Sequence, residues 1–435
     1  MTAPLGGLSR IDLRPGGDGA PRWRERCARA AGLEGAADAA AREIIAEVRA
    51  RGDAAVIELT ARFEGRALTP QTIEVDPRRR ARARESVSPE VRAALELAAR
   101  NVRRFHETQG HSTTGLHDPG ARLHSRVAPL RRVAVYAPGG TAAYPSSVLM
   151  AGIPAAVAGV DEILLLTPQA SDVVLLAAEL AGIHRVFEIG GAQAIAAAAL
   201  GTEVVPRVDK IVGPGNAYVT AAKRQVFGLC DIDGIAGPSE ILVVADASAD
   251  PGLVAADLIS QAEHDVLACA VLVTDHPPLA EATDAALREQ LDDLPRREIA
   301  TAALRDHGAA VLVADRDAMV AAAEQYAPEH LELLVVEPAA MAERLRGAGA
   351  IFVGPWTPEA AGDYTAGPSH VLPTAGAARF GSPLGVWDFV KHTSVLALER
   401  SALLAQAQAI VTLARAEGLE GHARAVERRL GDANR

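Results

Sequence analysis

The sequence predicts an α/β fold of the doubly wound kind, with its strands in two groups. Three observations predict it: nine short apolar runs, Ala-rich helical stretches between them, and glycines that follow two of the runs. Near-continuous apolar runs separated by helices are typical of parallel strands covered on both faces. Because nine strands exceed an ordinary sheet of about five or six, we expect more than one sheet.

The expected elements follow one another in a simple order. Residues 36–106 have the 3.6-residue apolar periodicity of helices. From Arg132 onward the expected strands are RVAVYA, EILLLTP, VFEIGG, KIVGPG, ILVVAD, ACAVLVTD, AAVLVAD, LELLVV and AIFVG. The segment GPSE, Gly237–Glu240, separates the first four runs from the last five. From about Ala397 the chain is predicted to be helical with no strand of its own, and to pack against its own domain or a partner subunit.

Length and charge narrow the class of protein. The chain has 435 residues, more than one ordinary core of ~100–200 residues accommodates, so two or more domains are expected. A formal charge of −11 disfavours nucleic acid as a partner, because phosphate binding needs a basic surface. The one basic run, RRRARAR at Arg78–Arg84, is interpreted as an exposed helix face.

The expected location is the cytoplasm. The three cysteines have no paired spacing and the N-terminus has no apolar leader, which predicts a reducing compartment. The least polar stretch, Val148–Val160, is shorter than the ~20 residues that a membrane helix needs.

An acid and an imidazole stand side by side in YAPEHLELLVV, Tyr326–Val336, where a buried strand is expected to begin. Pro328 disfavours helix at the residue before it, so the preceding helix should stop there. Functional groups of open α/β sheets lie at strand ends, and a base beside a carboxylate can be tuned toward neutral pH. Glu329 and His330 are either a catalytic pair or a capped turn, and the residues alone leave both interpretations open.

The segment QAEHD is a candidate metal site. Gln261 and His264 are three residues apart at the end of an expected helix, so they should share one face. An amide oxygen and an imidazole on one face can bind a metal. The alternative is a polar helix end with a histidine near the C-terminal dipole.

Two further histidines lie in polar surroundings. The loop AGDYTAGPSHVLPTAG, Ala361–Gly376, contains Asp363 and His370. Loops of this length are often functional, but an Asx-turn and a surface histidine explain the pattern equally well. His422 follows Glu417 by five residues in EGLEGHARAV, and by itself it is predicted to be an exposed helix residue.

The common nucleotide and hydrolase motifs are missing from the sequence. GPGNAYV has two glycines of a GxGxxG loop but not the third, and no GxxxxGK[ST], GxSxG or HExxH occurs. A nucleotide would therefore be held in an atypical way. The residues alone predict a two-domain α/β enzyme with a metal held by Gln, His and Asp.

The sequence resembles the histidinol dehydrogenases over nearly its whole length. In order along the chain, the segments that carry the resemblance are RVAVYAPGGTAAYPSSVLM, GGAQAIAA, VGPGNAYVTAAKR, DIDGIAGPSEI, ISQAEHD, YAPEHLEL, GDYTAGPSHVLPT and LEGHARAV. The resemblance implies two Rossmann-like domains, a C-terminal part exchanged in a homodimer, and oxidation of L-histidinol through L-histidinal to L-histidine by two NAD⁺. The implied domains are residues 30–130 with 239–384, residues 131–238 for NAD, residues 1–29 with 385–408, and a tail over 409–435.

The resemblance also implies roles for individual residues. One zinc per site would be bound by Gln261, His264, Asp363 and His422. Substrate would contact these four together with Ser239, His330, His370 and Glu417, and NAD would contact Tyr136, Gln193 and Asn216. His330 would be the general base, and Glu329 would activate water for the aldehyde step.

One departure and two rival functions remain. Pro368 and Ser369 stand where the family often has Thr and Asn, which leaves open a relative that oxidises a different polar alcohol. The rivals are a non-catalytic α/β binding protein and a zinc hydrolase that uses Glu329. Because Zn²⁺ accepts nitrogen and oxygen ligands and is redox-inert, it is expected to orient the substrate more than to drive hydride loss.

Overall fold

The computed structural model describes residues 6–29, 35–110, 112–139 and 144–431. The chain forms two compact units. Unit 1 comprises residues 1–109 and 130–389, and unit 2 comprises residues 110–129 and 390–435. All nine expected strands are present in unit 1, which confirms the α/β class. Among the described residues, no helix combines the length and apolarity needed to cross a membrane.

Unit 1 contains a six-stranded parallel sheet with the strand order β1-β11-β10-β9-β12-β13. Successive residues of β9 alternate between two apolar cores: Ile241 and Val243 pack on one face, and Leu242 and Val244 on the other. The strands are β1 (Ser9–Asp12), β9 (Glu240–Ala245), β10 (Cys269–Thr274), β11 (Ala309–Leu312), β12 (His330–Leu334) and β13 (Ala350–Val353).

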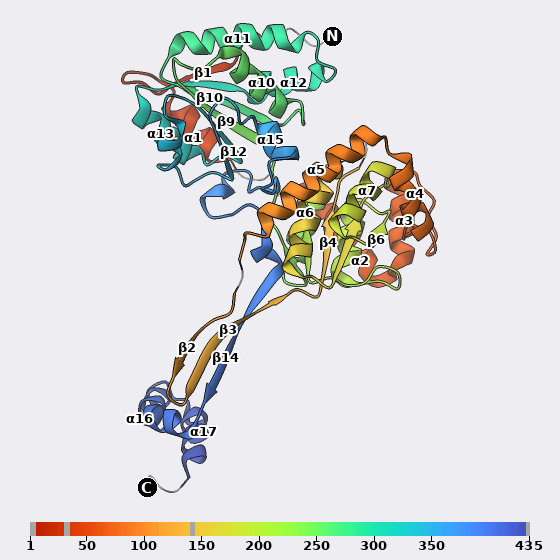
Figure 1. Ribbon diagram of the computed structural model, residues 1–435, viewed down its shortest axis with the longest axis vertical. Coiled ribbons are helices and arrows are strands. Elements are labelled where there is room, and N and C mark those ends of the chain that lie inside the picture. The colour runs from red at the N-terminus through yellow and green to blue at the C-terminus, as the bar shows by residue number, and fades with distance from the viewer. Residues whose placement is uncertain (1–5, 30–34, 111, 140–143, 432–435) are drawn as a thin grey trace. The chain divides into compact units, whose positions relative to one another are not determined.

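Helices cover both faces of this sheet, as its continuous apolar strands predict (Figure 1). One face carries α10 (Pro251–Ala262), α11 (Pro277–Leu291) and α12 (Arg297–His307). The other carries α1 (Ala20–Cys27), α13 (Arg316–Tyr326) and α14 (Pro338–Ala342), and α15 (Glu359–Tyr364) follows β13.

The second parallel sheet of unit 1 has five strands in the order β6-β5-β4-β7-β8. Its strands are β4 (Arg132–Tyr136), β5 (Glu162–Leu166), β6 (Arg185–Phe187), β7 (Lys210–Val212) and β8 (Asp231–Ile232). The chain crosses from this sheet to the six-stranded one through GPSE, as expected. The connecting helices are α6 (Pro145–Ala158), α7 (Asp172–Ala181), α8 (Gly191–Leu200) and α9 (Ala217–Val226).

The helices expected over residues 36–106 are present, but they pack on the five-stranded sheet. Residues of α2 (Ala36–Arg51) and α3 (Asp53–Glu64) share an apolar core with β4, α8 and α9, and α4 (Pro77–Ser86) and α5 (Pro89–His106) contact α7 and α6. This differs from the expected grouping of residues 30–130 with 239–384. Residues 9–12, expected in a small extension, form an edge strand of the six-stranded sheet. An amphipathic pattern shows that a helix has an apolar face, but not which sheet that face will cover.

Unit 2 contains three antiparallel strands that the sequence did not predict, and they come before the segment that was expected to be helical from about Ala397. β14 (Val390–Leu398) pairs antiparallel with β3 (Ala121–Pro129), which also pairs with β2 (Thr114–Asp118). The sequence signal was weak because β2 is exposed along its whole length and β14 is mostly exposed. The helices α16 (Arg400–Ala416) and α17 (Glu420–Leu430) follow and confirm the helical C-terminal region.

Candidate active site

Glu329 and His330 lie at the amino-terminal edge of the six-stranded sheet. Helix α13 ends at Tyr326, and Ala327 then adopts a left-handed conformation with φ of 49° before Pro328. His330 begins β12, where it pairs with Ile241 in β9. Ligand sites of doubly wound sheets usually lie at the carboxyl edge. The pair lies at a strand end, as predicted, but at the amino-terminal edge of the sheet and not at the usual carboxyl edge.

Oxygen atoms surround one nitrogen of the His330 ring. Nδ1 lies 3.1 Å from the Glu240 carbonyl oxygen, 3.5 Å from Glu359 Oε1 and 3.7 Å from Glu329 Oε2. Three acceptors around Nδ1 favour the tautomer that carries its proton there. In that tautomer Nε2 has the free lone pair, so Nε2 is the atom that can accept a proton.

Burial shifts the pKa values of both residues. Glu329 and His330 are 6% and 4% exposed. Burial lowers the pKa of His330 to about 4, so the imidazole is neutral at physiological pH and free to act as a base. Burial also raises the pKa of Glu329, against the hydrogen bond that the Glu240 N–H donates to its Oε2 at 2.9 Å. Because its pKa is raised, this carboxylate is a stronger base than an exposed glutamate.

A group of potential metal ligands lies beside this pair. His264, Glu359 and Asp363 each offer one ligand atom, and these atoms lie within 4.8 Å of one another. His264 Nε2 is 3.9 Å from Asp363 Oδ2. Helix α10 ends at Ala262, so His264 lies in the turn beyond it and not on its face as expected. Its N–H still donates to the Gln261 carbonyl at 3.2 Å, which keeps both residues on one turn.

Gln261 connects the metal-ligand group to the catalytic pair. Its side chain is fully buried. In the amide orientation that satisfies its neighbours, the amide nitrogen donates to Glu359 Oε1 at 2.8 Å and to the Glu240 carbonyl at 3.2 Å. This orientation leaves the amide oxygen available to a cation. Imidazole nitrogen, amide oxygen and carboxylate oxygen are donors that zinc accepts, so the residues present fit a zinc ion.

Sequence reasoning missed Glu359. This side chain is 1% exposed and accepts a hydrogen bond from Ser260 Oγ at 2.9 Å. Burial and the nearby Asp363 raise the pKa of its carboxyl. A signal was present, because Glu359 precedes Asp363 by four residues and therefore shares a face of the short helix α15.

The loop after α15 brings His370 to Asp363. The His370 Nδ1 lies 3.0 Å from the Asp363 carbonyl oxygen and 3.7 Å from its Oδ1. Burial lowers the pKa of His370. Pro368 is exposed, whereas Ser369 is buried and donates from Oγ to the Met150 carbonyl at 3.0 Å. Pro368 and Ser369 are the two residues that depart from the family pattern, and their side chains therefore lie in different surroundings from the side chain of His370.

The remaining predicted substrate residues lie in two places. Ser239 precedes β9, is half-buried, and accepts a hydrogen bond at its carbonyl from the Cys269 N–H at 3.0 Å. Glu417 and His422 lie in unit 2, at the end of α16 and in the first turn of α17, and both are exposed. The exposed position predicted for His422 is confirmed.

The three predicted NAD residues lie at the carboxyl edge of the five-stranded sheet. Tyr136 ends β4 and Asn216 follows β7, and these two neighbouring strands lead to opposite sides of the sheet. That is the topological switch point where doubly wound folds bind ligands. The Tyr136 hydroxyl accepts a hydrogen bond from the N–H of Gly191, where α8 begins, at 3.1 Å. Gln193 lies in the same helix and is buried. The contact of these three residues with NAD stays a prediction.

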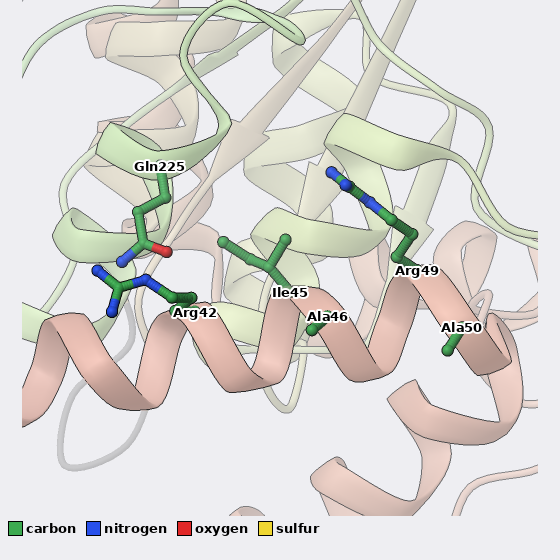
Figure 2. Close-up of a pocket in the computed structure, with 6 residues that line it drawn as sticks. All are labelled: Arg42, Ile45, Ala46, Arg49, Ala50 and Gln225. Carbon is green, nitrogen blue, oxygen red and sulfur yellow. The ribbon is translucent and has the colours of Figure 1, made fainter.

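A groove of about 320 Å³ on the outer surface of α2 and α9 carries none of these candidates (Figure 2). Arg42 and Gln225 extend toward each other at one end, and Arg49 lies farther along α2. Arg42 is already paired with Asp38, so its charge is partly neutralised.

Comparisons with known proteins agree with this geometry. The family model described as histidinol dehydrogenase matches residues 28–430. The chain is 49% identical to the histidinol dehydrogenase of Ralstonia nicotianae over 97% of this chain and 98% of that protein. It is 51% identical to that of Ruegeria pomeroyi over 91% of this chain and 93% of that protein. The crystal structure of histidinol dehydrogenase from Elizabethkingia anophelis covers both chains completely, with a TM-score of 0.91 and 33% identity.

Proposed function

Because this chain belongs to the histidinol dehydrogenase family, we propose that it oxidises L-histidinol through L-histidinal to L-histidine in two steps. The family consists of NAD-dependent oxidoreductases of histidine biosynthesis. The observation that carries the proposal is the buried His330, with three oxygens around Nδ1, beside a group of metal ligands. A turn without a function would leave these acids buried together at a cost in stability.

In the first step, His330 Nε2 accepts the proton of the histidinol hydroxyl while the carbinol carbon loses a hydride. The neutral imidazole that burial favours is the protonation state this transfer needs. The Nδ1 contacts hold the ring in one orientation while the charge of the imidazolium develops, and the Glu240 carbonyl, which accepts from Nδ1, stabilises that charge.

In the second step, Glu329 takes a proton from a water molecule whose oxygen adds to the aldehyde carbon. The His330 imidazolium returns its proton to the aldehyde oxygen, which completes the hydrate and leaves the imidazole neutral. His330 then accepts the proton of the resulting hydrate as its carbon loses the second hydride, which yields the carboxylic acid. Tyr136, Gln193 and Asn216 would hold NAD⁺, which when bound would supply the acceptor of each hydride.

Gln261, His264 and Asp363 are the residues of unit 1 that would hold zinc, and His422 is the fourth proposed ligand. When bound, the ion supplies a positive centre that orients the imidazole and amine nitrogens of the substrate. Ser239, His370 and Glu417 are proposed to hold the rest of the substrate.

The proposed assembly is a homodimer with shared active sites. The surface of unit 2 supports this, because Leu116, Leu396 and Leu413 are 56%, 70% and 64% exposed and its own helices bury only a small apolar core. Exposed apolar side chains of this size mark an interaction surface. In an isologous dimer each α17 lends His422 to its partner and borrows the same residue in return.

Mixed dimers test whether His422 acts across the interface. Asp363→Ala and His422→Ala subunits are each inactive alone under this proposal. When they exchange, about half of the dimers are mixed, and each mixed dimer has one intact site, so roughly a quarter of the parental activity should return. Absence of recovery, after mass measurement has confirmed the exchange, would assign His422 to its own chain.

The simplest test of the proposed function is NADH formation. The purified chain with zinc, NAD⁺ and L-histidinol should produce two NADH per histidine formed. A binding protein or a zinc hydrolase would produce none, and a relative with another substrate would leave histidinol unoxidised while accepting a different polar alcohol.

A further inference from the structure

Arg29 is the second residue after α1 and lies behind the proposed catalytic pair. It is bound by Glu240, the first residue of β9, and β9 is the strand that supports the pair. Its Nε is 2.5 Å from Glu240 Oε2 and its Nη2 is 2.8 Å from Oε1, which makes a two-point contact with the carboxylate. The side chains are 16% and 2% exposed. A guanidinium that binds both carboxylate oxygens fixes the direction of the carboxylate as well as its charge.

The backbone of Glu240 contacts both members of the pair. Its N–H donates to Glu329 Oε2 at 2.9 Å, and its carbonyl accepts from His330 Nδ1 at 3.1 Å. The first residue of β9 therefore sets the position of the proposed water-activating carboxyl and the tautomer of the proposed base. A shift of Glu240 would displace both groups together.

Arg29 also binds the chain that leads into β12. Its Nη1 donates to the Tyr326 carbonyl at 2.8 Å, and its Nη2 lies 3.4 Å from the Ala327 carbonyl. These carbonyls come directly before Pro328 and the catalytic pair. Ala327 has a positive φ of 49°, which is unfavourable for a residue with a side chain and persists only where the surroundings hold it.

The aromatic ring of Tyr326 places the guanidinium. The Arg29 guanidinium carbon lies 3.5 Å from the ring centroid of Tyr326, and the ring stacks on Trp23 of α1 with centroids 5.5 Å apart. Trp23 in turn donates from Nε1 to Gln325 Oε1 at 2.9 Å. Helix α1 and the end of α13 thus form a rigid support, and the two helices lie side by side in Figure 1.

We infer that Arg29 is a positioning residue that aligns Glu329 and His330 by holding Glu240 on one side and the Tyr326–Ala327 turn on the other. This inference rests on the proposed function of the pair. A buried ion pair adds little net stability compared with apolar side chains of the same volume, because desolvation offsets the attraction. Its main contribution here is geometric, and misplacement of reacting groups by about 1 Å can slow a reaction roughly 10²-fold.

The test compares Arg29→Gln with Arg26→Gln in the zinc-loaded, full-length enzyme. Arg26 also ties α1 to the same domain, by donating to the carbonyls of His307 and Gly308, but it contacts neither Glu240 nor the β12 turn. Arg29→Gln should lower kcat per zinc-loaded site roughly 10²-fold for both histidinol and histidinal, with little change in KM. Arg26→Gln should keep the parental kcat even where its unfolding temperature falls.

Two further variants separate alignment from folding. Arg29→Lys keeps the charge but loses the two-point contact, so it should recover part of kcat. Glu240→Gln should lower kcat as Arg29→Gln does, and the double variant should be no slower than the slower single one.

Parental kcat in a folded Arg29→Gln enzyme would overturn the inference, as would equal losses in the Arg29 and Arg26 variants. Should Arg29→Gln fail to fold, parental kcat in Arg29→Lys overturns it instead. A parent enzyme that makes no NADH from histidinol is a different result, which contradicts the proposed function itself.

Discussion

The two parallel sheets of unit 1 bury their charged groups in different ways. Beside the five-stranded sheet, the buried Lys210 and Lys223 each meet a carboxylate, from Asp231 and Asp233. At the six-stranded sheet, Glu329, Glu332 and Glu359 are buried, and among the described residues none of them pairs with a lysine or arginine.

Buried charges that are fully paired are explained by structure alone, whereas buried acids without cations need a further explanation. A bound cation and proton transfer both supply one, and both agree with the proposed chemistry. The contrast therefore supports the proposal that the metal and the proton steps belong to the six-stranded sheet, whereas NAD binding at the five-stranded sheet is proposed from its switch point alone.

Removal of the metal should have the largest effect on activity. It should affect the proposed site at the six-stranded sheet and leave NAD binding at the five-stranded sheet intact. Chelation should abolish histidinol oxidation, and Zn²⁺ should restore it, because the donor set beside the catalytic pair would lose the cation that orients the substrate. NAD binding, measured by calorimetry, should change little. His264→Ala should lower the zinc content measured by elemental analysis. Full activity in an enzyme verified to be free of zinc would contradict the assignment.

Replacement of the catalytic pair should have the next largest effect. His330→Asn should slow both half-reactions by roughly 10²–10⁴-fold, or about 3–5 kcal/mol in the barrier, because it removes the base of both steps. Glu329→Gln should slow histidinal oxidation more than histidinol oxidation, because only the aldehyde step adds water. Single-turnover rates with each substrate measure this difference. Equal impairment of both steps by Glu329→Gln would remove the proposed division of roles.

A change at the five-stranded sheet should alter NAD binding and leave the chemistry intact. Gln193→Ala should raise the KM for NAD⁺ about tenfold, the effect of losing roughly 1.4 kcal/mol of binding, with a smaller change in the KM for histidinol. Steady-state kinetics with each substrate varied in turn tests this. The thermal unfolding midpoint serves as the control, because Gln193 is buried and also donates to Glu64 Oε1 at 3.3 Å. A larger effect on histidinol than on NAD⁺ would break the assignment of the two sheets.

The sequence was sufficient to predict the nine central parallel strands but not to predict which helices pack on them. Apolar runs predicted all nine central strands, because burial on both faces leaves a strong signal in each run. The exposed β2 and the edge strand β1 carry no such signal, and both were missed. The grouping of α2 and α3 with the five-stranded sheet depends on contacts across the fold, which local periodicity does not contain.

The same limit applies to the candidate site. The segment PEH drew attention to the proposed catalytic pair, since an acid and an imidazole at the start of an apolar strand are unusual, although the residues alone left a capped turn equally open. Glu359 could have been found from its spacing to Asp363, whereas Arg29 stands in the ordinary run WRERCARA and reaches Glu240 only through the fold. Residues that act directly on substrate leave local patterns more often than residues that position them.

The smallest expected effect on activity concerns Glu332, a buried acid of β12 that the proposed reaction does not use. Burial raises its pKa to about 10, with a further contribution from the neighbouring carboxyl of Asp257 on α10. Two carboxyl groups in such contact share a proton.

The sign of the pH effect follows from this shift. The folded protein keeps a proton on Glu332 that the unfolded chain releases above its ordinary pKa of 4.5, so stability should fall as the pH rises from about 4.5 toward 10. Glu332→Gln keeps the shape and a hydrogen-bond donor without needing that proton. Its unfolding free energy should therefore depend less on pH, by up to about 1.4 kcal/mol per pH unit, and should exceed the parental value most clearly in mildly alkaline solution. Urea unfolding at several pH values measures both slopes, and parallel curves would show that Glu332 is ionised in the folded protein.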